Sequence, residues 1–291
     1  MNAGLFPGQG IPARTVLDAL PEKDPLLENA SDEVGYDLRR KVEIAARRRG
    51  ASLPTSVAQP AIFTASLIGH RRLTEEGASH DFLAGHSLGE YAALVAAGAL
   101  GFSDGLRCVV VRAEAMQAAS RSSAGGMAVI LGVDLSVVEE IAEELGVYVA
   151  NDNAPGQAVL AGSDEGLAKA AAAARSRGGR SVLLDVSGPF HTVAMAPAEG
   201  PLRRALEKAD LSEPRVPVLS NVTAAPHGRP DEIRELLVRQ LSSRVRWRES
   251  LAWLWARGAR RVNDVGPGEI VAGLAQRTFV ALADEEVSAR V

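Results

Sequence analysis

The stretch AGHSLGEYAALVAAG, residues 84–98, restricts the fold more than any other part of the sequence. The preceding letters, HDFLAG, form a short run typical of a buried strand, and the following small and apolar residues predict a buried helix. Only Gly-His-Ser-Leu-Gly separates the two, so the chain must turn very sharply at Ser87. A strand that passes so abruptly into a helix indicates an α/β protein.

The same five residues, GHSLG, match the G-x-S-x-G pattern of a nucleophilic serine. A tight turn forces Ser87 into a strained conformation, and the flanking glycines leave room for neighbouring backbone. The hydroxyl then stands clear of the sheet at the positive end of a helix. The alternative interpretation is a polar turn that merely precedes a buried helix. The apolar strand before the turn and the long helix after it favour the nucleophile.

Residues 125–186 carry a distinct pattern of strand, helix, strand, strand, helix, strand. The quoted runs are GMAVILGV, DLSVVEEIAEELG, VYVAND, QAVLAGS, DEGLAKAAAAARSRGG and RSVLLDV. This βαββαβ order is that of a ferredoxin-like unit. Because αβ patterning resumes on both sides, the sequence predicts an inserted small subdomain at 125–186 and a larger α/β subdomain formed by 1–124 and 187–291.

Composition narrows the functional classes. A net charge of −4 does not suggest nucleic-acid binding, and no run approaches the ~18 apolar residues of a membrane span. The start, MNAGLFPGQG, has no basic segment before an apolar one, so we expect no secretion signal. The single cysteine, Cys108, fits packing inside a helix and a reducing compartment. The sequence therefore predicts a cytoplasmic, globular protein.

A serine nucleophile needs a base, and the chain has five histidines. His86 adjoins the serine, but neighbours on such a turn point apart, so a structural hydrogen bond is expected there. His70 and His80 read as surface residues, and His227 lies in a loop. His191, in DVSGPFHTVAMAP, follows the last strand of the inserted unit and is well placed to face a cleft. A lone histidine at such a position is more often an ordinary capping or core residue.

Several motifs, taken together and in order, resemble one family. They are FPGQG, GHSLGEYAALVAAGAL, the arginine of VVVRAEAMQ, GGMAVILG, NDNAPGQAVLAG, GPFHT, NVTA, QLSSRVRW and DVGPGEIVAGL. The chain resembles malonyl-CoA:acyl-carrier-protein transacylases and freestanding acyltransferases of the polyketide-synthase type, nearly from end to end. The resemblance implies an α/β fold with a hydrolase-like body, a parallel central sheet and the inserted ferredoxin-like (βαββαβ) subdomain.

The resemblance also implies roles for residues of this chain. Ser87 is similar to the family's nucleophile and His191 to its base. Gln240 resembles the residue whose backbone carbonyl orients the histidine in place of an aspartate. Gln9 and Leu88 resemble the two residues whose backbone N–H groups form the oxyanion hole. No metal is expected in this site.

Arg112 resembles the arginine that binds the free carboxylate of the acyl group. A planar guanidinium suits that task because it can donate two parallel hydrogen bonds to a carboxylate. Helical spacing alone places Arg112 on the flank of an apolar stripe, where it could reach a cleft edge. Leu88 and Phe190 resemble malonyl-selective members, and Phe190 would crowd an α-methyl group. Ile11 and Pro12 depart from the family's usual polar residues, and residues 11–50 resemble the family weakly. Both flank the expected entrance of the acyl pocket, which leaves an unusual acyl group or carrier open.

The expected reaction moves a malonyl group from CoA to the phosphopantetheine thiol of an acyl carrier protein through an acyl-serine. The implied substrate is malonyl-CoA, with no permanently bound cofactor, and the implied partner is an acyl carrier protein or a polyketide-synthase carrier domain. No nucleic acid or membrane partner is expected. Carrier proteins are acidic, so a basic docking face is expected, with Arg244, Arg246 and Arg248 as candidates.

Other functions remain open on the sequence. A thioesterase on the same scaffold would use the same serine and histidine but release free acid. A transferase could instead carry a bulky or non-malonyl acyl group. A nucleotide-binding module is suggested only by GQGIPA after AGLF, a faint echo of G-x-G-x-x-A, and Pro7 and Pro12 suit it badly. An inactive interaction protein is disfavoured because Ser87 and His191 are both present.

Overall fold

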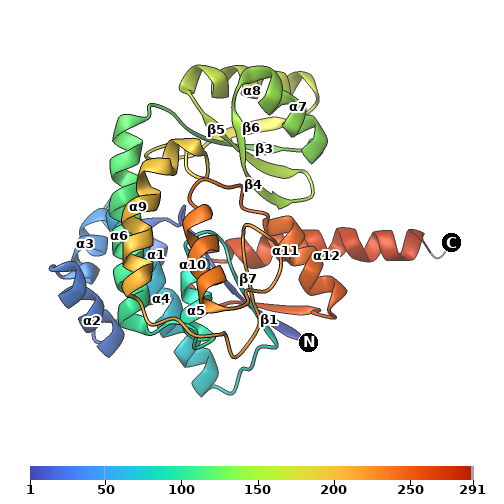
Figure 1. Cartoon of the computed structure of the whole chain (residues 1–291). Coiled ribbons are helices and arrows are strands. Elements are labelled where there is room, and N and C mark those ends of the chain that lie inside the picture. The colour runs from blue at the N-terminus through green and yellow to red at the C-terminus, as the bar shows by residue number, and fades with distance from the viewer. Residues whose placement is uncertain (49, 290–291) are drawn as a thin grey trace.

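The computed structural model describes residues 1–48 and 50–289, which contain one parallel and one antiparallel sheet (Figure 1). The parallel sheet has the order β7-β2-β1-β8. Its strands are β1 (Asn2–Phe6), β2 (Phe82–Gly85), β7 (Val218–Leu219) and β8 (Arg261–Asp264). The central strands β1 and β2 are buried at nearly every position, as expected of parallel strands covered on both faces.

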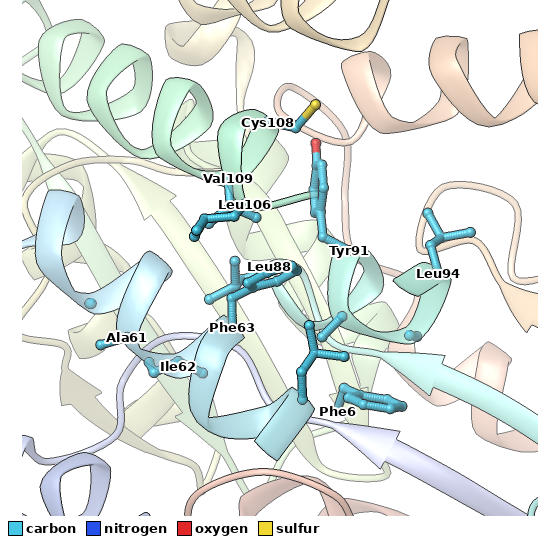
Figure 2. Packing of buried hydrophobic residues seen from close by; sticks show 14 of the residues in the cluster. Phe6, Ala61, Ile62, Phe63, Leu88, Tyr91, Leu94, Leu106, Cys108 and Val109 are labelled. Carbon is cyan, nitrogen blue, oxygen red and sulfur yellow. The ribbon is translucent and has the colours of Figure 1, made fainter. Parts of the chain in front are cut away.

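Helices surround this sheet. They are α1 (Ala13–Ala19), α2 (Pro25–Val34), α3 (Leu38–Ala46), α4 (Thr55–Glu75), α5 (Gly89–Ala96), α6 (Phe102–Ser122), α9 (Ala196–Lys208), α10 (Pro230–Arg239), α11 (Trp247–Ala256) and α12 (Ile270–Ser288), with a short 3₁₀ turn, η1 (Val193–Met195). Figure 2 shows Phe63 and Leu106 packed beside Leu88, at the start of α5. No helix within the described residues has the length and apolarity to cross a membrane.

The antiparallel sheet forms a second layer with two helices on one face (Figure 1). Its elements are β3 (Gly126–Leu131), α7 (Leu135–Leu145), β4 (Tyr148–Ala154), β5 (Gln157–Gly162), α8 (Asp164–Ser176) and β6 (Arg180–Leu183). The strand order β4-β5-β3-β6 is the order of a ferredoxin-like unit. The expected fold class, a parallel α/β body with an inserted βαββαβ unit, is confirmed.

Strand β3 shows how this small sheet serves two purposes. Side chains alternate between the faces of a strand. Ala128 and Ile130 are buried in an apolar cluster with residues of α7 and α8. Met127 and Val129, on the opposite face, line a cleft that also contains Ser87 and His191. One face of the sheet therefore holds the small layer together, while the other forms part of the candidate site.

The start of α4 differs from the sequence expectation. We expect a helix from about residue 61 with Pro60 in its first position, but α4 begins at Thr55 and includes Pro60. Proline inside a helix removes one backbone hydrogen bond. The cost is tolerated because α4 is buried along its first fourteen residues, from Thr55 to Ile68, at nearly every position. The additional turn brings Gln59 into the core beside the candidate site.

Candidate active site

Ser87 lies at the corner between β2 and α5, with a backbone φ of 52°. A positive φ is strained for a residue other than glycine, and such strain is concentrated at functional sites. The two glycines of GHSLG make the corner possible. A Cβ on Gly85 would lie 1.9 Å from the carbonyl carbon of Gly89, and one on Gly89 would lie 2.2 Å from Phe6 O. The expected strained, glycine-flanked turn is therefore present.

His191 reaches this corner from the loop after β6. Its Nε2 lies 2.8 Å from Ser87 Oγ, and its Nδ1 lies 2.9 Å from the backbone oxygen of Gln240. A carbonyl oxygen can only accept, so Nδ1 carries the proton and Nε2 accepts from the serine hydroxyl. This is the tautomer that a general base requires. His191 also has a positive φ, 60°, so both members of the pair sit on strained backbone.

The environment of His191 keeps the imidazole neutral. Burial, reinforced by the positive charge of Arg112, lowers the pKa of His191 to about 3. The hydrogen bond to the Gln240 carbonyl opposes this shift. A neutral imidazole can accept the serine proton over the whole range in which enzymes ordinarily work.

Arg112 extends from α6 into the layer behind the serine. Its Nη2 donates to Ser87 Oγ at 3.0 Å and to Gln240 Oε1 at 2.9 Å, and its Nη1 donates to Gln59 Oε1 at 2.7 Å. Its side chain is fully buried. As helical spacing suggested, Arg112 does not point to solvent, but it lies deeper than the cleft edge and contacts the cleft at Ser87. Its guanidinium also faces the Tyr91 ring, 5.6 Å from the centroid.

The loop after β1 is linked to the same arginine. Gln59 Nε2 donates to Gln9 Oε1 at 2.9 Å, while Gln59 Oε1 accepts from Arg112. Gln59 therefore ties the loop to the guanidinium. Leu88, the residue after the serine, stands at the start of α5, where backbone N–H groups have no partner within the helix. The structure thus brings Gln9 and Leu88 to the Ser87 corner from two different elements.

The cleft above Ser87 and His191 has a volume of about 380 Å³. The small sheet contributes Met127, Val129 and Val159 to its wall, and α12 contributes residues from its first turns. Phe190 also lines the cleft and is otherwise buried, 5% exposed. This mixture of an apolar wall and a polar floor is typical of a pocket for a small organic substrate.

The two residues that depart from the family pattern after the GQG turn differ in position. Pro12 lines the cleft, whereas the side chain of Ile11 is buried in the apolar core. Of these two residues, only Pro12 can alter the cleft wall directly, and Gly50, at the end of the weakly matching segment 11–50, lines the cleft as well.

His86 turns away from the serine hydroxyl. Its Nε2 lies 2.9 Å from Asn153 Oδ1, and its ring packs edge-on against Trp247 at 5.3 Å. The expected structural hydrogen bond of His86 is confirmed. Cys108 is buried in α6, close to the hydroxyl end of Tyr91 (Figure 2), and burial raises the pKa of its thiol to about 12. It is packing rather than a nucleophile, as expected.

Sequence reasoning missed a group of polar side chains beneath the corner. Asn221 Oδ1 accepts from the Ser87 N–H at 2.6 Å, and Asn221 Nδ2 donates to Gly85 O at 2.7 Å. Glu90 and His227 are fully buried and in contact, with 2.7 Å between Oε1 and Nε2. One signal was available in the sequence: Glu90 is a lone carboxylate in an otherwise apolar helix, and a buried charge needs a partner.

The three arginines proposed for a basic docking face are each paired internally. Arg244 Nη1 lies 2.6 Å from Glu139 Oε1, Arg246 Nε lies 2.8 Å from Glu249 Oε1, and Arg248 Nε lies 2.9 Å from Asp152 Oδ1. Their positive charges are therefore largely compensated within the chain. Among the described residues, no group of three His, Cys, Asp or Glu side chains is arranged to hold a metal ion.

Comparison with known sequences places this geometry among acyltransferases. Residues 8–290 match the family described as the acyl transferase domain. The chain is 37% identical to the malonyl CoA-acyl carrier protein transacylase of Bacillus subtilis over 297 residues, 98% of this chain and 94% of that protein. It is 38% identical to the enzyme of the same name from Escherichia coli K12 over 303 residues, covering 99% and 96%.

Solved structures agree with the sequence relatives. An acyl-carrier-protein S-malonyltransferase from Burkholderia pseudomallei superimposes with a TM-score of 0.88 at 38% identity, over 95% of this chain and 92% of that one. A malonyl-transacylase in complex with a type II polyketide-synthase acyl-carrier protein gives 0.86 at 34% identity, over 96% and 93%.

Proposed function

This chain belongs to the acyl transferase family, and we propose that it transfers a malonyl group from CoA to the phosphopantetheine thiol of an acyl carrier protein. The observation that carries the proposal is the position of Ser87 Oγ, 2.8 Å from His191 Nε2 and 3.0 Å from Arg112 Nη2. One hydroxyl is thereby in contact with both a neutral base and a cation suited to a carboxylated acyl group.

The first half-reaction loads the serine. His191 Nε2 takes the hydroxyl proton while Ser87 Oγ forms a bond to the thioester carbonyl carbon. The oxyanion is stabilised by the N–H groups of Gln9 and Leu88. Collapse of this intermediate breaks the C–S bond, and the imidazolium returns the proton to the CoA sulfur. Malonyl-serine and free CoA result.

The second half-reaction unloads the serine. The carrier thiol gives its proton to His191 and its sulfur attacks the ester carbonyl of the malonyl group. The bond to Ser87 Oγ then breaks, and the oxygen recovers the proton. Atoms and charges balance without an oxidant or reductant, so the proposed reaction needs malonyl-CoA as substrate and no permanently bound cofactor. A CoA donor and a single buried cysteine fit a cytoplasmic enzyme.

Arg112 provides the preference for malonyl. Its buried Nε has no hydrogen-bond partner within the described residues, and its Nη groups donate to amide and hydroxyl oxygens. A malonyl carboxylate that takes the place of one of these neutral acceptors gives the guanidinium a charged partner. Such a bond is worth about 1.5–3 kcal/mol. That amount favours malonyl over acetyl by roughly ten- to a hundredfold, because about 1.4 kcal/mol is tenfold.

Phe190 sets the second limit on the substrate. Its ring lies in the cleft wall next to the catalytic histidine and is held in the apolar core behind it. A branch at the α-carbon of the acyl group would have to displace this ring, and tightly packed interiors resist such displacement. Phe190 therefore favours malonyl over acyl groups with an α-methyl substituent.

The products of the reaction distinguish a transferase from a hydrolase. The enzyme is mixed with malonyl-CoA and a carrier protein that carries phosphopantetheine, and malonyl-carrier and free malonate are separated by chromatography. We expect malonyl-carrier as the main product. The same carrier without phosphopantetheine is the matched control and should remain unmodified. Malonate as the main product in both reactions would instead identify a thioesterase.

A further inference from the structure

Glu90 lies in the first turn of α5, three residues after the serine, and is fully buried. Three donors surround its carboxylate. His227 Nε2 lies 2.7 Å from Oε1, while Gln240 Nε2 and the Asn221 N–H lie 2.7 Å and 3.0 Å from Oε2. The transfer reaction uses neither Glu90 nor His227, because neither side chain is in contact with Ser87 Oγ or His191. Their burial therefore calls for another explanation.

His227 comes from the loop after β7, 137 residues further along the chain. Its backbone N–H donates to Val218 O at 2.8 Å, which fixes the loop against the sheet. A carboxylate can only accept, so Nε2 must carry a proton when it faces Glu90. Hydrogen bonds to a charged group are stronger than neutral ones, and here both side chains are shielded from water. His227 thus holds the Glu90 carboxylate in one orientation.

Gln240 connects this pair to the substrate-binding arginine. Its Nε2 donates to Glu90 Oε2 at 2.7 Å and to Ser87 O at 3.0 Å, and its Oε1 accepts from Arg112 Nη2 at 2.9 Å. A flipped amide would place its oxygen against the carboxylate and its N–H groups against the guanidinium. Both contacts would be repulsive, so the carboxylate of Glu90 determines which way the amide faces.

The same arrangement stabilises a buried positive charge. Burial lowers the pKa of Arg112, while Tyr91 and Glu90 act in the opposite direction. The cation of Arg112 and the anion of Glu90 are separated by one amide, so each compensates the other across Gln240. Glu90 therefore stabilises the charge of the guanidinium across Gln240, without forming a direct ion pair with Arg112.

We propose that Glu90, locked in place by His227, is a positioning residue for malonyl recognition: through the amide of Gln240 it aims the Arg112 guanidinium at the acyl carboxylate. The inference rests on the proposed function and deepens it. The inference distinguishes between two roles of the hydrogen-bond network around Glu90. A network that only supports the strained corner acts on every acyl group alike, whereas one that acts through Arg112 matters for an acyl group with a carboxylate.

The test compares single-turnover loading of the serine by malonyl-CoA and by acetyl-CoA. His227→Met removes the donor to Glu90 at similar volume, and His227→Gln restores an N–H donor near the Nε2 position. We expect His227→Met to reduce loading by malonyl-CoA about tenfold, the equivalent of one charged hydrogen bond, and loading by acetyl-CoA by less than about twofold. His227→Gln should recover most of the malonyl rate. His80→Met is the matched control, because His80 does not line the cleft and is paired with Asn263.

Three results would overturn the inference: no change in His227→Met, an equal loss for both acyl groups, or no recovery in His227→Gln. If His227→Met does not fold, the ratio of malonyl to acetyl loading rates can be measured in Glu90→Gln instead. This variant keeps the shape of the side chain and removes the charge that orients Gln240. We expect its malonyl preference to fall as well. Failure of the wild-type chain to load malonyl at all would instead refute the proposed function, so the two failures are distinguishable.

Discussion

The small antiparallel sheet and the corner at Ser87 face each other across the same cleft, but they are held together by different interactions. The sheet depends on alternating apolar side chains such as Ile130 and Leu160, packed against α7 and α8. The corner depends on polar side chains from separate elements, among them Asn221 and Gln240, whose partners lie more than a hundred residues away. One region resists unfolding through buried area, and the other maintains a strained geometry through hydrogen bonds.

Because the two regions are held together differently, their contributions to stability and to the reaction can be separated by mutation. Removing an apolar side chain from the sheet should weaken the fold and leave the reaction intact in molecules that remain folded. Removing a polar group from the corner should impair the reaction and weaken the fold much less, because the strained geometry serves the reaction and is not needed for stability. The following predictions test that separation, beginning with the largest expected effect.

Ser87→Ala should lower the rate of malonyl transfer by at least about a thousandfold, because it removes the atom that carries the acyl group. The free energy of unfolding should stay within about 1 kcal/mol of the wild type, since the variant keeps the backbone and loses one hydroxyl. Transfer is measured with the carrier assay and stability by urea titration. An unfolded Ser87→Ala variant would contradict the claim that the corner can be changed without loss of stability.

Ile130→Ala should lower the free energy of unfolding by about 2–5 kcal/mol, since the side chain is 1% exposed and its removal leaves a cavity against α7 and α8. The loading rate per folded molecule should remain unchanged. Val182→Ala, on the exposed edge strand β6, is the control and should change stability by no more than about 0.5 kcal/mol. A large loss of loading rate in folded Ile130→Ala would show that the sheet contributes to the reaction as well as to stability.

Arg112→Gln should reduce the preference for malonyl-CoA over acetyl-CoA by roughly ten- to a hundredfold, through the loss of the charged hydrogen bond to the substrate carboxylate. The ratio of the two loading rates measures the preference. Arg107→Gln, on the exposed side of the same helix, should leave the ratio unchanged. An unaltered ratio in Arg112→Gln would remove the arginine from substrate recognition.

Of the two regions compared, only the corner contains histidines, since residues 125–186 have none. Burial lowers the pKa of His191 to about 3, from the 6.5 that is usual for a histidine. The loading rate should therefore stay nearly flat from pH 7 down to about 5, instead of falling with a midpoint near 6.5. Initial rates across this range provide the measurement, and a midpoint near 6.5 would contradict the burial effect.

Stability should respond to pH in the same window. In the unfolded chain this histidine binds a proton below about pH 6.5, whereas in the native protein it stays neutral down to about pH 3. The unfolded state therefore binds more protons between these two pH values, and acid favours unfolding. The free energy of unfolding should fall by at most about 1.4 kcal/mol per pH unit from this residue. His191→Gln should reduce that slope, as measured by urea titration at several pH values.

The features that the sequence predicted best are those with local patterns. The alternation in β3, the βαββαβ order and the glycines around Ser87 all follow from spacing within a few residues. The family resemblance singled out Arg112 as a substrate-binding residue. Its helical spacing suggested a side chain at the cleft edge, and only the structure shows that the side chain is fully buried.

The features that the sequence missed are contacts between distant segments. Gln59 escaped notice because Pro60 suggested a later helix start, and tertiary burial outweighed the cost of the proline. His227 read as a loop residue because its partner, Glu90, lies 137 residues away. Pairing across such distances is decided by the packing of β7 against β2, which no local pattern records.

The central claim is that the hydroxyl of Ser87 carries the acyl group, and the intact mass of the protein tests it most directly. The enzyme is mixed with malonyl-CoA, quenched in acid and weighed, and the modified residue is mapped by peptide fragmentation. We predict a single malonyl adduct on Ser87 that disappears when a carrier protein with phosphopantetheine is added, and no adduct on Ser87→Ala. An unmodified wild-type protein, or an equal adduct on both proteins, would contradict the account.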